Sequence, residues 1–378
     1  MAAFRFIHTA DLHLGRRFGN FPEEARGRLV EARHQIIPRL IAAARDHGAR
    51  HILVAGDLFD TETPSDGVWR QALLAMGTHA DVHWWIIPGN HDSLAAESLW
   101  TRFRQRAPGN VHLVGDVEPI EIEPGVFLLP APLPRRFPGR DLTAWMAECV
   151  TDPRAMRIGL AHGAIRDFSE DGGGAEGIIP PDRAQTARLD YLALGDWHGR
   201  IAVGDRCWYA GAPERDSFRH DGRGACLAVA VEERGAVPRV EPVDIGTFTW
   251  SNESLPLLPG QSAADALQAL LPRDAVSRRD HLMRVSAVGR ATLSERAELE
   301  AAARSVSAEF CHFVLDTEFL ALEFDAGDLD EIDRAGALRL AAENLSAAAC
   351  DESVPEAERR ISAGALNRLY GYLREDRK

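Results

Sequence analysis

The sequence predicts a layered α/β protein that also carries a smaller α+β unit and C-terminal helices. Short apolar runs of strand length recur between residues 4 and 195, and helical segments separate the first three of them. Strands that alternate with helices are typical of a sheet that is covered by helices. Because the runs are apolar nearly throughout, we expect strands that are buried on both faces. After residue 246, strand and helix patterns begin again on a smaller scale.

The five strand-like runs share one feature: each leads into a polar side chain that can bind a metal ion. In open α/β sheets, polar residues at the carboxyl ends of the strands gather in one crevice. We therefore expect these side chains to meet in space. The runs are FRFIH before Asp11, HILVAG before Asp57, VHWWIIPG before Asn90, RIGLA before His162 and YLALG before Asp196.

Three helices are expected between and after the first strands. The first begins with Pro and acidic residues and is followed by Gly, as helix ends commonly are. Its internal Pro38 predicts a kink or a break. Ser65 and Ser93 are candidate N-caps of the second and third helices. The three segments are residues 22–47, 66–79 and 94–107.

The chain is expected to hold three regions. The alternation of strands and helices weakens after residue 105, where short strands with Pro and Gly turns take over. The predicted regions are a large domain over 1–246, a small α+β domain over 247–325 and a helical tail over 326–378. In the small domain we expect strands at 247–257, 281–289 and within 312–324, and helices at 263–271 and 293–306; in the tail, helices at 334–348 and 355–374.

Three segments of this outline are open to two interpretations. The glycine-rich stretch at 170–177 is either a solvent-exposed loop or a lid near the expected crevice. The acidic stretch at 325–333 is either a linker or the start of an exposed helix. The last helix carries one apolar stripe, which packs on its own chain or docks into a partner. The stripe consists of Ile361, Leu366, Leu369, Tyr370 and Leu373.

Composition excludes some classes of function. The net charge is −14, and an acidic chain does not favour broad, non-specific binding to nucleic acid, which depends on Lys and Arg. The five cysteines are far apart and form no CxxC pair, which predicts a reducing compartment. The first residues lack the apolar core of a signal peptide, and no apolar run is long enough to span a membrane. We therefore expect a cytoplasmic protein without membrane contact.

The polar residues after the strands form a pattern that predicts a dinuclear metal site. Asp11 with His13, and Asp196 with His198, are pairs at positions i and i+2 that can turn toward one ion. Asp57 has two oxygens and can bridge two ions. Carboxylate, imidazole and amide ligands suit Mn²⁺, Fe²⁺ or Zn²⁺. Two ions about 3.5–4 Å apart can stabilise both the attacking and the leaving oxygen of a phosphoryl group. Glycines beside these residues permit sharp turns and close backbone approach.

Together these motifs resemble those of a known family. The order of the motifs resembles the calcineurin-like metallophosphoesterases and, more narrowly, the SbcD-type DNA repair exonucleases. The resemblance covers residues 4–218, and the small unit that follows is similar to the capping domain of that family. It implies a β-sandwich flanked by helices and a metal-dependent DNA nuclease, exonuclease or endonuclease, that hydrolyses phosphodiester bonds. The motifs are HTADLHLG, GDLFDTETPS, PGNHDS, YLALGDWH and YAGAPERDSF.

The resemblance also implies roles for individual residues. His91 would face the phosphate and protonate or stabilise the leaving oxygen, and Asp92 would orient His91. The two ions would usually be manganese, and Asp57 would be shared between them. DNA and an SbcC-like coiled-coil ATPase are the implied partners, and relatives are often dimers. The implied ligand sets are Asp11, His13, Asp57 and His198 for one ion, and Asp57, Asn90, His162 and Asp196 for the other.

Asp196 departs from the family pattern. The last motif of the family is usually Gly-His-x-His, whereas this chain has Gly195-Asp196-Trp197-His198. A carboxylate oxygen is a good ligand for Mn²⁺, so Asp196 can bind the second ion and add negative charge beside it. Alternatively, Asp196 only forms a hydrogen bond to a neighbour, and the second site is weak or empty.

Two other functions are compatible with these motifs. The first is a phosphatase or small-molecule phosphodiesterase on the same scaffold, which the acidic charge and the altered last motif favour. The second is a non-catalytic subunit that anchors an ATPase through its C-terminal helices. For the nuclease, five arginines are candidate contacts to the DNA backbone, although surface arginines are also common without such a role. They are Arg16, Arg17, Arg135, Arg136 and Arg140.

Overall fold

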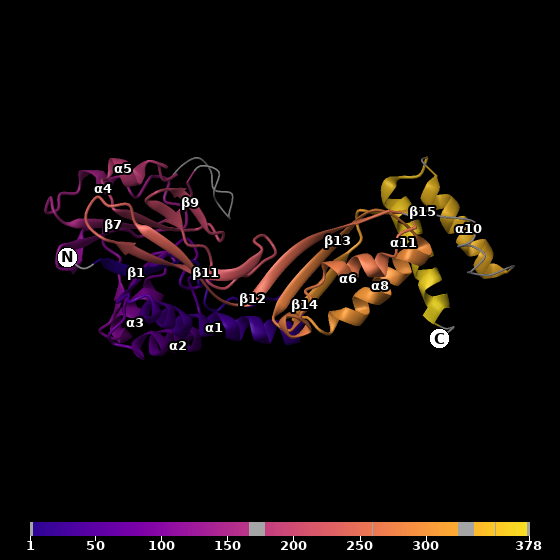
Figure 1. The fold of residues 1–378 in the computed structure, drawn as a ribbon, viewed down its shortest axis with the longest axis horizontal. Helices are drawn as coiled ribbons and strands as arrows, with labels where there is room; N and C mark the ends of the chain where they lie inside the picture. Colours follow the sequence, from indigo (N-terminus) through magenta and orange to yellow (C-terminus); the bar gives the residue numbers. More distant parts are fainter. Residues whose placement is uncertain (1–2, 166–177, 259, 324–335, 352, 376–378) are drawn as a thin grey trace. The chain divides into compact units, whose positions relative to one another are not determined.

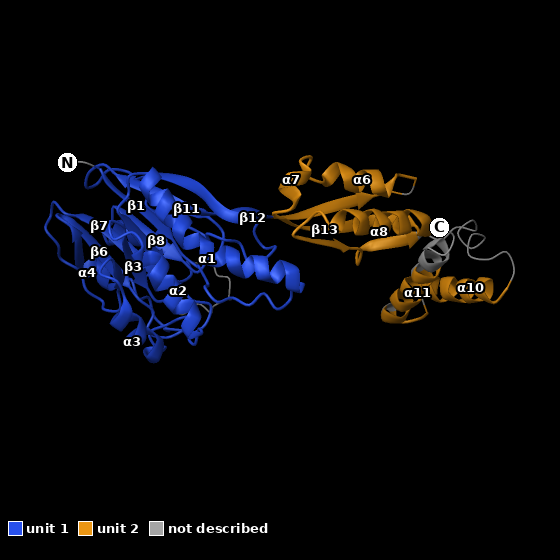
Figure 2. Cartoon of the chain, turned by 90° about the horizontal axis from the view of Figure 1, so that it is seen from below, with its two compact units in different colours: residues 1–249 blue, residues 250–378 orange. Residues whose placement is uncertain are grey.

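The computed structural model describes residues 3–165, 178–258, 260–323, 336–351 and 353–375. These residues form two compact units, residues 1–249 and 250–378 (Figure 2). The boundary lies three residues beyond the end expected for the first domain. The structure groups all later elements in the second unit, so the division at residue 325 stays a prediction.

The first unit is built on two sheets. In the larger one, β1, β2, β3 and β4 are parallel neighbours, and β11 pairs with β1 in the antiparallel sense. The long strand β12 lies beside β11 in the same sheet and continues into the second unit. The bounds are β1 Phe4–Thr9, β2 His51–Ala55, β3 His83–Ile87, β4 Val111–Leu113, β11 Gly222–Val231 and β12 Arg239–Leu257.

The second sheet of this unit has the order β5-β6-β7-β8-β10-β9. Strands β6, β7, β8 and β10 run parallel, and β5 and β9 are antiparallel at the two edges. Their bounds are β5 Ile120–Glu123, β6 Val126–Ala131, β7 Met156–His162, β8 Tyr191–Gly195, β9 Ile201–Gly204 and β10 Cys207–Tyr209.

Three helices cover one face of the larger sheet: α1 Glu23–Asp46, α2 Asp66–Gly77 and α3 Glu97–Arg106 (Figure 1). Their buried side chains, such as Ile36, Trp69 and Phe103, form one core with Ile52 and Val54 of β2. Burial of these large apolar side chains is what holds the helices on the sheet.

The sequence located these helices, with one difference inside a helix and one at a helix start. The helix α1 continues through Pro38, so the predicted break is absent. Ser65 occupies the N-cap position of α2 as expected, but its side chain forms no capping hydrogen bond. The helix α3 begins after Ala96, so the assignment of Ser93 as its N-cap is wrong. The Ser93 hydroxyl instead donates to the Glu62 carboxylate over 3.0 Å.

The two sheets pack face to face and complete a sandwich. Leu53 of β2 points to the opposite side from its neighbours Ile52 and Val54, into a second core with Leu128 and Ile158 of the smaller sheet. This alternation is the two-residue period of a strand. The outer face of the smaller sheet is covered by α4 Trp145–Glu148 and α5 Arg183–Thr186 with adjoining loops (Figure 1). The expected β-sandwich flanked by helices is confirmed.

The second unit has an α+β fold with its own core. Strand β13 lies beside β12 and pairs in parallel with both β14 and β15. Side chains such as Leu257, Leu267, Val285 and Leu299 form the core beneath α6 and α8. The elements are α6 Ala263–Leu270, α7 Ala275–Arg278, β13 His281–Thr292, α8 Leu293–Ser307, β14 His312–Asp316, β15 Leu320–Glu323, α10 Ala337–Cys350 and α11 Glu356–Glu375.

The residues of the apolar stripe on the last helix differ in how far they are buried. Leu366 is fully buried against Leu293 and Ala342, and Leu369 packs against the same group, whereas Ile361 is 70% exposed. The side chains of Tyr370 and Leu373 lie outside the described residues, as do the stretches 170–177 and 325–333. Among the helices that the structure describes, none combines the length and the apolar character needed to cross a bilayer.

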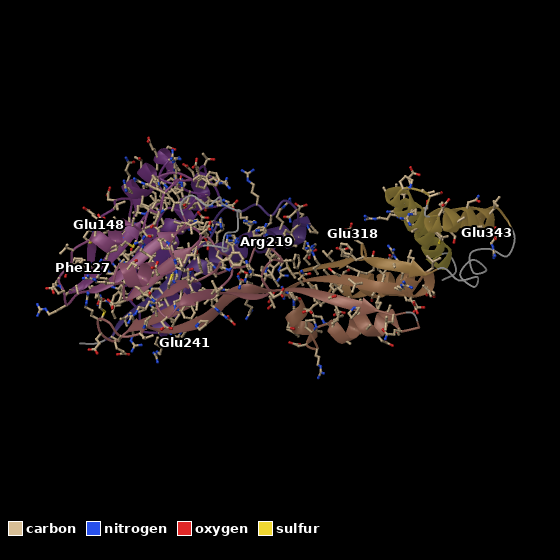
Figure 3. All side chains as sticks on the ribbon, turned by 90° about the horizontal axis from the view of Figure 1, so that it is seen from above. Phe127, Glu148, Arg219, Glu241, Glu318 and Glu343 are labelled. Atoms are coloured by element: carbon tan, nitrogen blue, oxygen red, sulfur yellow. The ribbon has the colours of Figure 1, made fainter. Side chains whose placement is uncertain are left out.

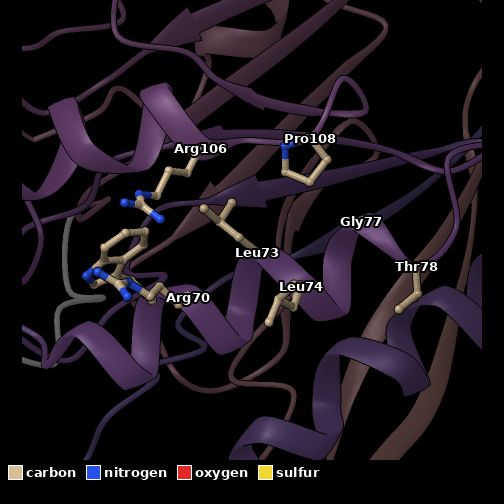
Figure 4. Close-up of a pocket in the computed structure, with 8 residues that line it drawn as sticks. Arg70, Leu73, Leu74, Gly77, Thr78, Arg106 and Pro108 are labelled. Atoms are coloured by element: carbon tan, nitrogen blue, oxygen red, sulfur yellow. The ribbon is translucent and has the colours of Figure 1, made fainter.

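The surface of the first unit carries charged side chains and an apolar groove. Glu148, Arg219 and Glu241 are exposed on it (Figure 3). The groove has a volume of about 550 Å³ and contains none of the expected site residues. It is lined by Trp69, Arg70, Leu73, Leu74, Gly77 and Thr78 of α2 and its end, together with Arg106 and Pro108 (Figure 4).

Candidate metal centre

The expected ligands lie at the carboxyl ends of five strands, β1, β2, β3, β7 and β8, and the structure brings them together. Four of them have a positive φ, which non-glycine residues rarely adopt: Asp11 at 56°, His13 at 44°, Asp57 at 53° and Asp196 at 103°. Such conformations cost about 1–3 kcal/mol each and collect at functional sites. The loops therefore hold these side chains in position at the expense of backbone strain.

His13 and His198 form the centre of the first ligand set. Their Nε2 atoms lie 3.1 Å apart, and an oxygen of Asp11 lies within 4.8 Å of both side chains' ligand atoms. Oδ2 of Asp11 is buried and has no hydrogen-bond partner in the structure. A buried carboxylate oxygen without a partner is costly, and a cation would satisfy it.

His162 forms the centre of the second ligand set. Its Nδ1 lies 2.8 Å from the carbonyl oxygen of Ala55, which can only accept, so Nδ1 carries the hydrogen. Burial lowers the pKa of His162, so the ring is neutral and Nε2 presents a lone pair. That lone pair faces Oδ1 of Asn90 at 2.9 Å. Two acceptors at this distance repel each other unless a cation binds both, as expected for metal ligands.

Asp57 lies between the two sets. Its Oδ2 is 3.7 Å from Nε2 of His13 and 3.6 Å from Nε2 of His162. Its Oδ1 accepts a hydrogen bond of 2.9 Å from the backbone N–H of His91. One carboxylate oxygen is thus fixed by the backbone, and the other faces both histidines, which is the arrangement that a bridging ligand requires.

Asp196, the residue that departs from the family pattern, faces the second set. Its Oδ1 lies 3.8 Å from Nε2 of His162, and its backbone N–H donates to Oδ1 of Asp11 over 3.1 Å. The residue is 8% exposed. Its carboxylate is therefore directed at Nε2 of His162, the atom that Asn90 and Asp57 also face.

Two glycines are required by the closeness of these loops. A Cβ on Gly89 would lie 2.1 Å from Oδ1 of Asp57, and one on Gly56 would lie 2.2 Å from Nδ1 of His162. Gly56 also has a φ of 88°. The expected close backbone approach is confirmed at both positions.

The electrostatics of the centre favour a divalent cation. Burial raises the pKa of Asp11 well above its ordinary value; His198 opposes this shift, and the Asp57 and Asp196 carboxylates add to it. Burial also lowers the pKa of His13 to about 3, so its ring is neutral and can donate a lone pair. A cation would relieve the repulsion among the carboxylates. The donor set of carboxylate, imidazole and amide groups fits Mn²⁺, Fe²⁺ or Zn²⁺.

His91 and Asp92 occupy different positions in the same loop. Nδ1 of His91 lies 3.0 Å from the carbonyl oxygen of Asp60, and its ring contacts that of His13 edge to face at 4.8 Å between centroids. The two oxygens of Asp92 accept hydrogen bonds from the backbone N–H groups of Gly89 and Phe59. Asp92 therefore joins two site loops, and the partner seen on the His91 ring is Asp60. The orienting of His91 by Asp92 stays a prediction.

Sequence reasoning missed a layer of charged residues behind the ligands. Oδ1 of Asp60 lies 3.5 Å from Nδ1 of His13, and Oδ2 of Asp216 lies 3.4 Å from Nδ1 of His198. Arg33 is 1% exposed on α1 and lies 3.4 Å from the same oxygen of Asp216. Asp60 and Asp216 stand in the motifs GDLFD and YAGAPERDSF, so a signal for both was present.

The candidate DNA-binding arginines are placed differently from one another. Arg16 lies 3.1 Å from Asp216 and 3.5 Å from Asp60, so it belongs to this charged layer. Arg17 is exposed, as are Arg135, Arg136 and Arg140. The loop that carries these last three is joined to the site: backbone hydrogen bonds run from Leu94 to Leu133 and from Leu133 to Pro88.

Comparison with known proteins gives a family match over the first unit. A sequence model described as calcineurin-like phosphoesterase matches residues 4–200 of the 378. The matched range contains all the expected metal ligands together with His91 and Asp92.

Individual relatives are more distant. The chain is 30% identical over 216 residues to YhaO, an uncharacterized metallophosphoesterase of Bacillus subtilis. The aligned region covers 52% of this chain and 48% of that protein. It is 28% identical over 288 residues to the SbcD subunit of the nuclease SbcCD from Rhodobacter capsulatus, covering 63% and 69%, respectively. The corresponding SbcD protein of Escherichia coli K12 is 35% identical over 95 residues, covering 24% and 22%. The chain thus spans less than half of the Bacillus and Escherichia coli relatives.

Proposed function

The chain belongs to the calcineurin-like phosphoesterase family, and from this premise we propose that it is a DNA nuclease that hydrolyses phosphodiester bonds at a dinuclear metal centre. The proposed ligands are Asp11, His13, Asp57 and His198 for one ion, and Asp57, Asn90, His162 and Asp196 for the other. The observation that carries the metal centre is the pair of facing acceptors, Nε2 of His162 and Oδ1 of Asn90, 2.9 Å apart.

The mechanism assigns a separate task to each group around the phosphate. When bound, two divalent cations supply the positive charge that stabilises a phosphoryl group under attack. As an imidazolium, His91 gives the proton on its Nε2 to the leaving oxygen and is left neutral, while its Nδ1 continues to donate to the Asp60 carbonyl. Asp57 keeps its Oδ2 directed at both ligand sets because the His91 N–H holds its Oδ1. Asp92 fixes the loops that carry Asp57 and His91 relative to each other.

The loop over 132–140 supports DNA as the substrate rather than a small phosphate ester. Phe137 is 64% exposed, and the guanidinium of Arg136 lies 5.4 Å from the centre of its ring. Arg135 and Arg140 are exposed in the same loop. An exposed aromatic ring among arginines offers base stacking and phosphate contacts to a nucleic-acid strand. This loop is hydrogen-bonded to the backbone on both sides of His91, at Pro88 and Leu94, and we propose that a strand bound to it continues toward the centre.

Further parts of the proposal rest on relatives and on ligand chemistry. Manganese is the proposed ion, since it accepts carboxylate and imidazole ligands together. The relatives that are named as the SbcD component of nuclease SbcCD favour an SbcC-like coiled-coil ATPase as a partner, with DNA repair in the cytoplasm as the setting. A homodimer is proposed by the same resemblance.

A phosphatase or small-molecule phosphodiesterase remains the second candidate, favoured by the net charge of −14. Incubation with Mn²⁺ and end-labelled single-stranded and double-stranded DNA separates the two. The nuclease predicts cleavage of DNA, alone or with the ATPase partner, and slow turnover of a nitrophenyl phosphate monoester. Fast turnover of the monoester with intact DNA would contradict the nuclease and support the second candidate.

A further inference from the structure

Three consecutive charged residues, Glu214, Arg215 and Asp216, are buried behind the metal centre. Their exposures are 1%, 9% and 6%, which is unusual for charged side chains. They follow strand β10 in the motif YAGAPERDSF. Burying three adjacent charges costs free energy unless each charge has a partner, so the partners of these residues indicate what the segment does.

Two of these residues contact the proposed ligand His198. Oδ2 of Asp216 lies 3.4 Å from Nδ1 of the His198 ring, and the Arg215 guanidinium donates to the His198 carbonyl oxygen. Asp216 is in turn paired with Arg33 at 3.4 Å and with Arg16 at 3.1 Å. A carboxylate on Nδ1 directs Nε2 of a histidine toward a metal ion and fixes the orientation of the ring.

The side chain of the third residue, Glu214, contacts strand β12 and not His198. Its Oε2 accepts a hydrogen bond of 2.5 Å from the backbone N–H of Thr247, and its Oε1 accepts one of 3.2 Å from Phe248. Both donors lie in β12, directly before the boundary between the units at Thr249 and Trp250. The carbonyl oxygen of Glu214 also accepts from Arg33 over 3.2 Å, so the same arginine contacts Glu214 and Asp216.

The backbone segments around Glu214 approach each other closely. A Cβ on Gly224 of β11 would lie 2.2 Å from the carbonyl oxygen of Pro213, and one on Gly246 of β12 would lie 2.6 Å from the nitrogen of Gly224. Segment 213–214, β11 and β12 are therefore in direct backbone contact. In a close-packed region of this kind, a shift of one backbone segment is passed to the next.

We propose that residues 214–216 are a positioning segment that couples the backbone of β12 at Thr247 and Phe248 to the metal ligand His198, so that the affinity of the first ion site depends on this connection. Glu214 touches no proposed ligand, and it acts through Arg215 and Asp216. The inference rests on the proposed binding of metal by His198, but not on the identity of the substrate.

The test compares two variants of the segment with a matched control. Glu214→Gln keeps the size of the side chain but replaces one of the two acceptor oxygens with a donor, and Asp216→Asn removes the charge facing His198. The control is Asp190→Asn. Asp190 is also buried, at 3% exposure, and its two oxygens also join two backbone segments, at Arg157 and Gly235, but they do not contact residues 196–198.

The measurement is a titration of the full-length protein with Mn²⁺ alone, in which free Mn²⁺ is counted by electron paramagnetic resonance. We expect wild type to bind two ions and Asp216→Asn to bind one of the two about 10–100-fold more weakly, the usual effect of losing a partner of a metal-ligating histidine. Because Glu214 acts through its neighbours, we expect Glu214→Gln to weaken binding of the same ion by a smaller factor. Asp190→Asn is expected to keep both affinities. If a variant is too unstable to titrate, the rise in its melting temperature with added Mn²⁺ gives the same comparison, because at a fixed Mn²⁺ concentration tighter binding stabilises the folded state more.

Each outcome either supports or overturns the proposed coupling. A loss of affinity in Glu214→Gln but not in Asp190→Asn supports the coupling. Equal affinities in Glu214→Gln and wild type overturn it, even if the variant melts at a lower temperature, because the role of Glu214 would then be structural only. If wild type itself binds no Mn²⁺, the proposed metal centre fails, and the coupling fails with it.

Discussion

Nε2 of His13 and Nε2 of His198 lie 3.1 Å apart, although 185 positions separate the two residues in the sequence. Each ring has a carboxylate near its other nitrogen, Asp60 for His13 and Asp216 for His198. With a hydrogen on each Nδ1, the two Nε2 atoms present lone pairs to the same point. A divalent cation at that point would turn a repulsive contact into two bonds.

Metal binding should therefore stabilise the protein. We expect the melting temperature of the full chain to rise when Mn²⁺ is added and to fall when a chelator removes it. Mn²⁺ at about 100 times its dissociation constant would add about 2.7 kcal/mol to the free energy of unfolding. Differential scanning calorimetry measures this directly. Identical melting curves in Mn²⁺ and in chelator would be incompatible with a centre that binds metal.

Substitutions of Asp196 separate its two interpretations. If Asp196 is a ligand of the second ion, Asp196→Asn lowers the affinity for that ion about 10-fold or more. Asp196→His, which restores the family pattern, still binds two ions. Isothermal titration with Mn²⁺ gives the stoichiometry of each variant. Two ions of unchanged affinity in Asp196→Asn would mean that the carboxylate only forms hydrogen bonds.

The loop that carries Phe137 should affect DNA but not small substrates. We expect Phe137→Ala to slow DNA cleavage, since stacking on an aromatic ring contributes about 1–3 kcal/mol per base. Hydrolysis of bis(4-nitrophenyl) phosphate should stay unchanged, because that substrate is too small to need the loop. The exposed Phe319 of the second unit, 70% exposed, provides a control, and Phe319→Ala should leave both activities as in wild type. Equal loss on both substrates in Phe137→Ala would assign the loop to folding instead.

His8 predicts how stability changes with pH. Its ring is fully buried, with Nδ1 2.9 Å from the Tyr191 hydroxyl and Nε2 3.1 Å from the Leu194 carbonyl oxygen. Burial lowers its pKa from the ordinary value of 6.5 to about 3. Below pH 6.5 the unfolded chain binds a proton that the folded chain does not, so the stabilising contribution of His8 is present above pH 6.5 and is lost as the pH falls toward 3.

The measurement is chemical denaturation of wild type and His8→Gln between pH 7 and pH 5, both in chelator. One such group adds a slope of up to about 1.4 kcal/mol per pH unit. The free energy of unfolding should therefore fall less steeply in His8→Gln than in wild type. Parallel curves would show that His8 does not titrate differently in the two states.

Much of the fold and the positions of the expected ligands could be predicted from the sequence, because both depend on local patterns. Apolar runs such as HILVA, residues 51–55, are strands, and polar residues that follow parallel strands must meet at one edge. The glycines beside the ligands also stand where the structure allows no side chain, as at Gly89.

What could not be predicted depends on contacts between distant segments. Arg33 occupies the buried face of α1 between Leu29 and Ile36, where a helical pattern predicts an apolar residue. Its partners, the Leu12 carbonyl and the 214–216 segment, come from other parts of the chain. Ser93 was expected to cap α3, but a bond to Glu62 on another loop replaces the cap. No local pattern indicates such partners.

The two-ion centre shared by Asp57 is tested most directly by a crystal structure of the protein grown with Mn²⁺, with the ions located by their anomalous scattering. We expect two ions, one on each side of Oδ2 of Asp57, with His13 and His198 binding the first and Asn90, His162 and Asp196 the second. A single ion, or two ions that Asp57 does not bridge, would contradict it.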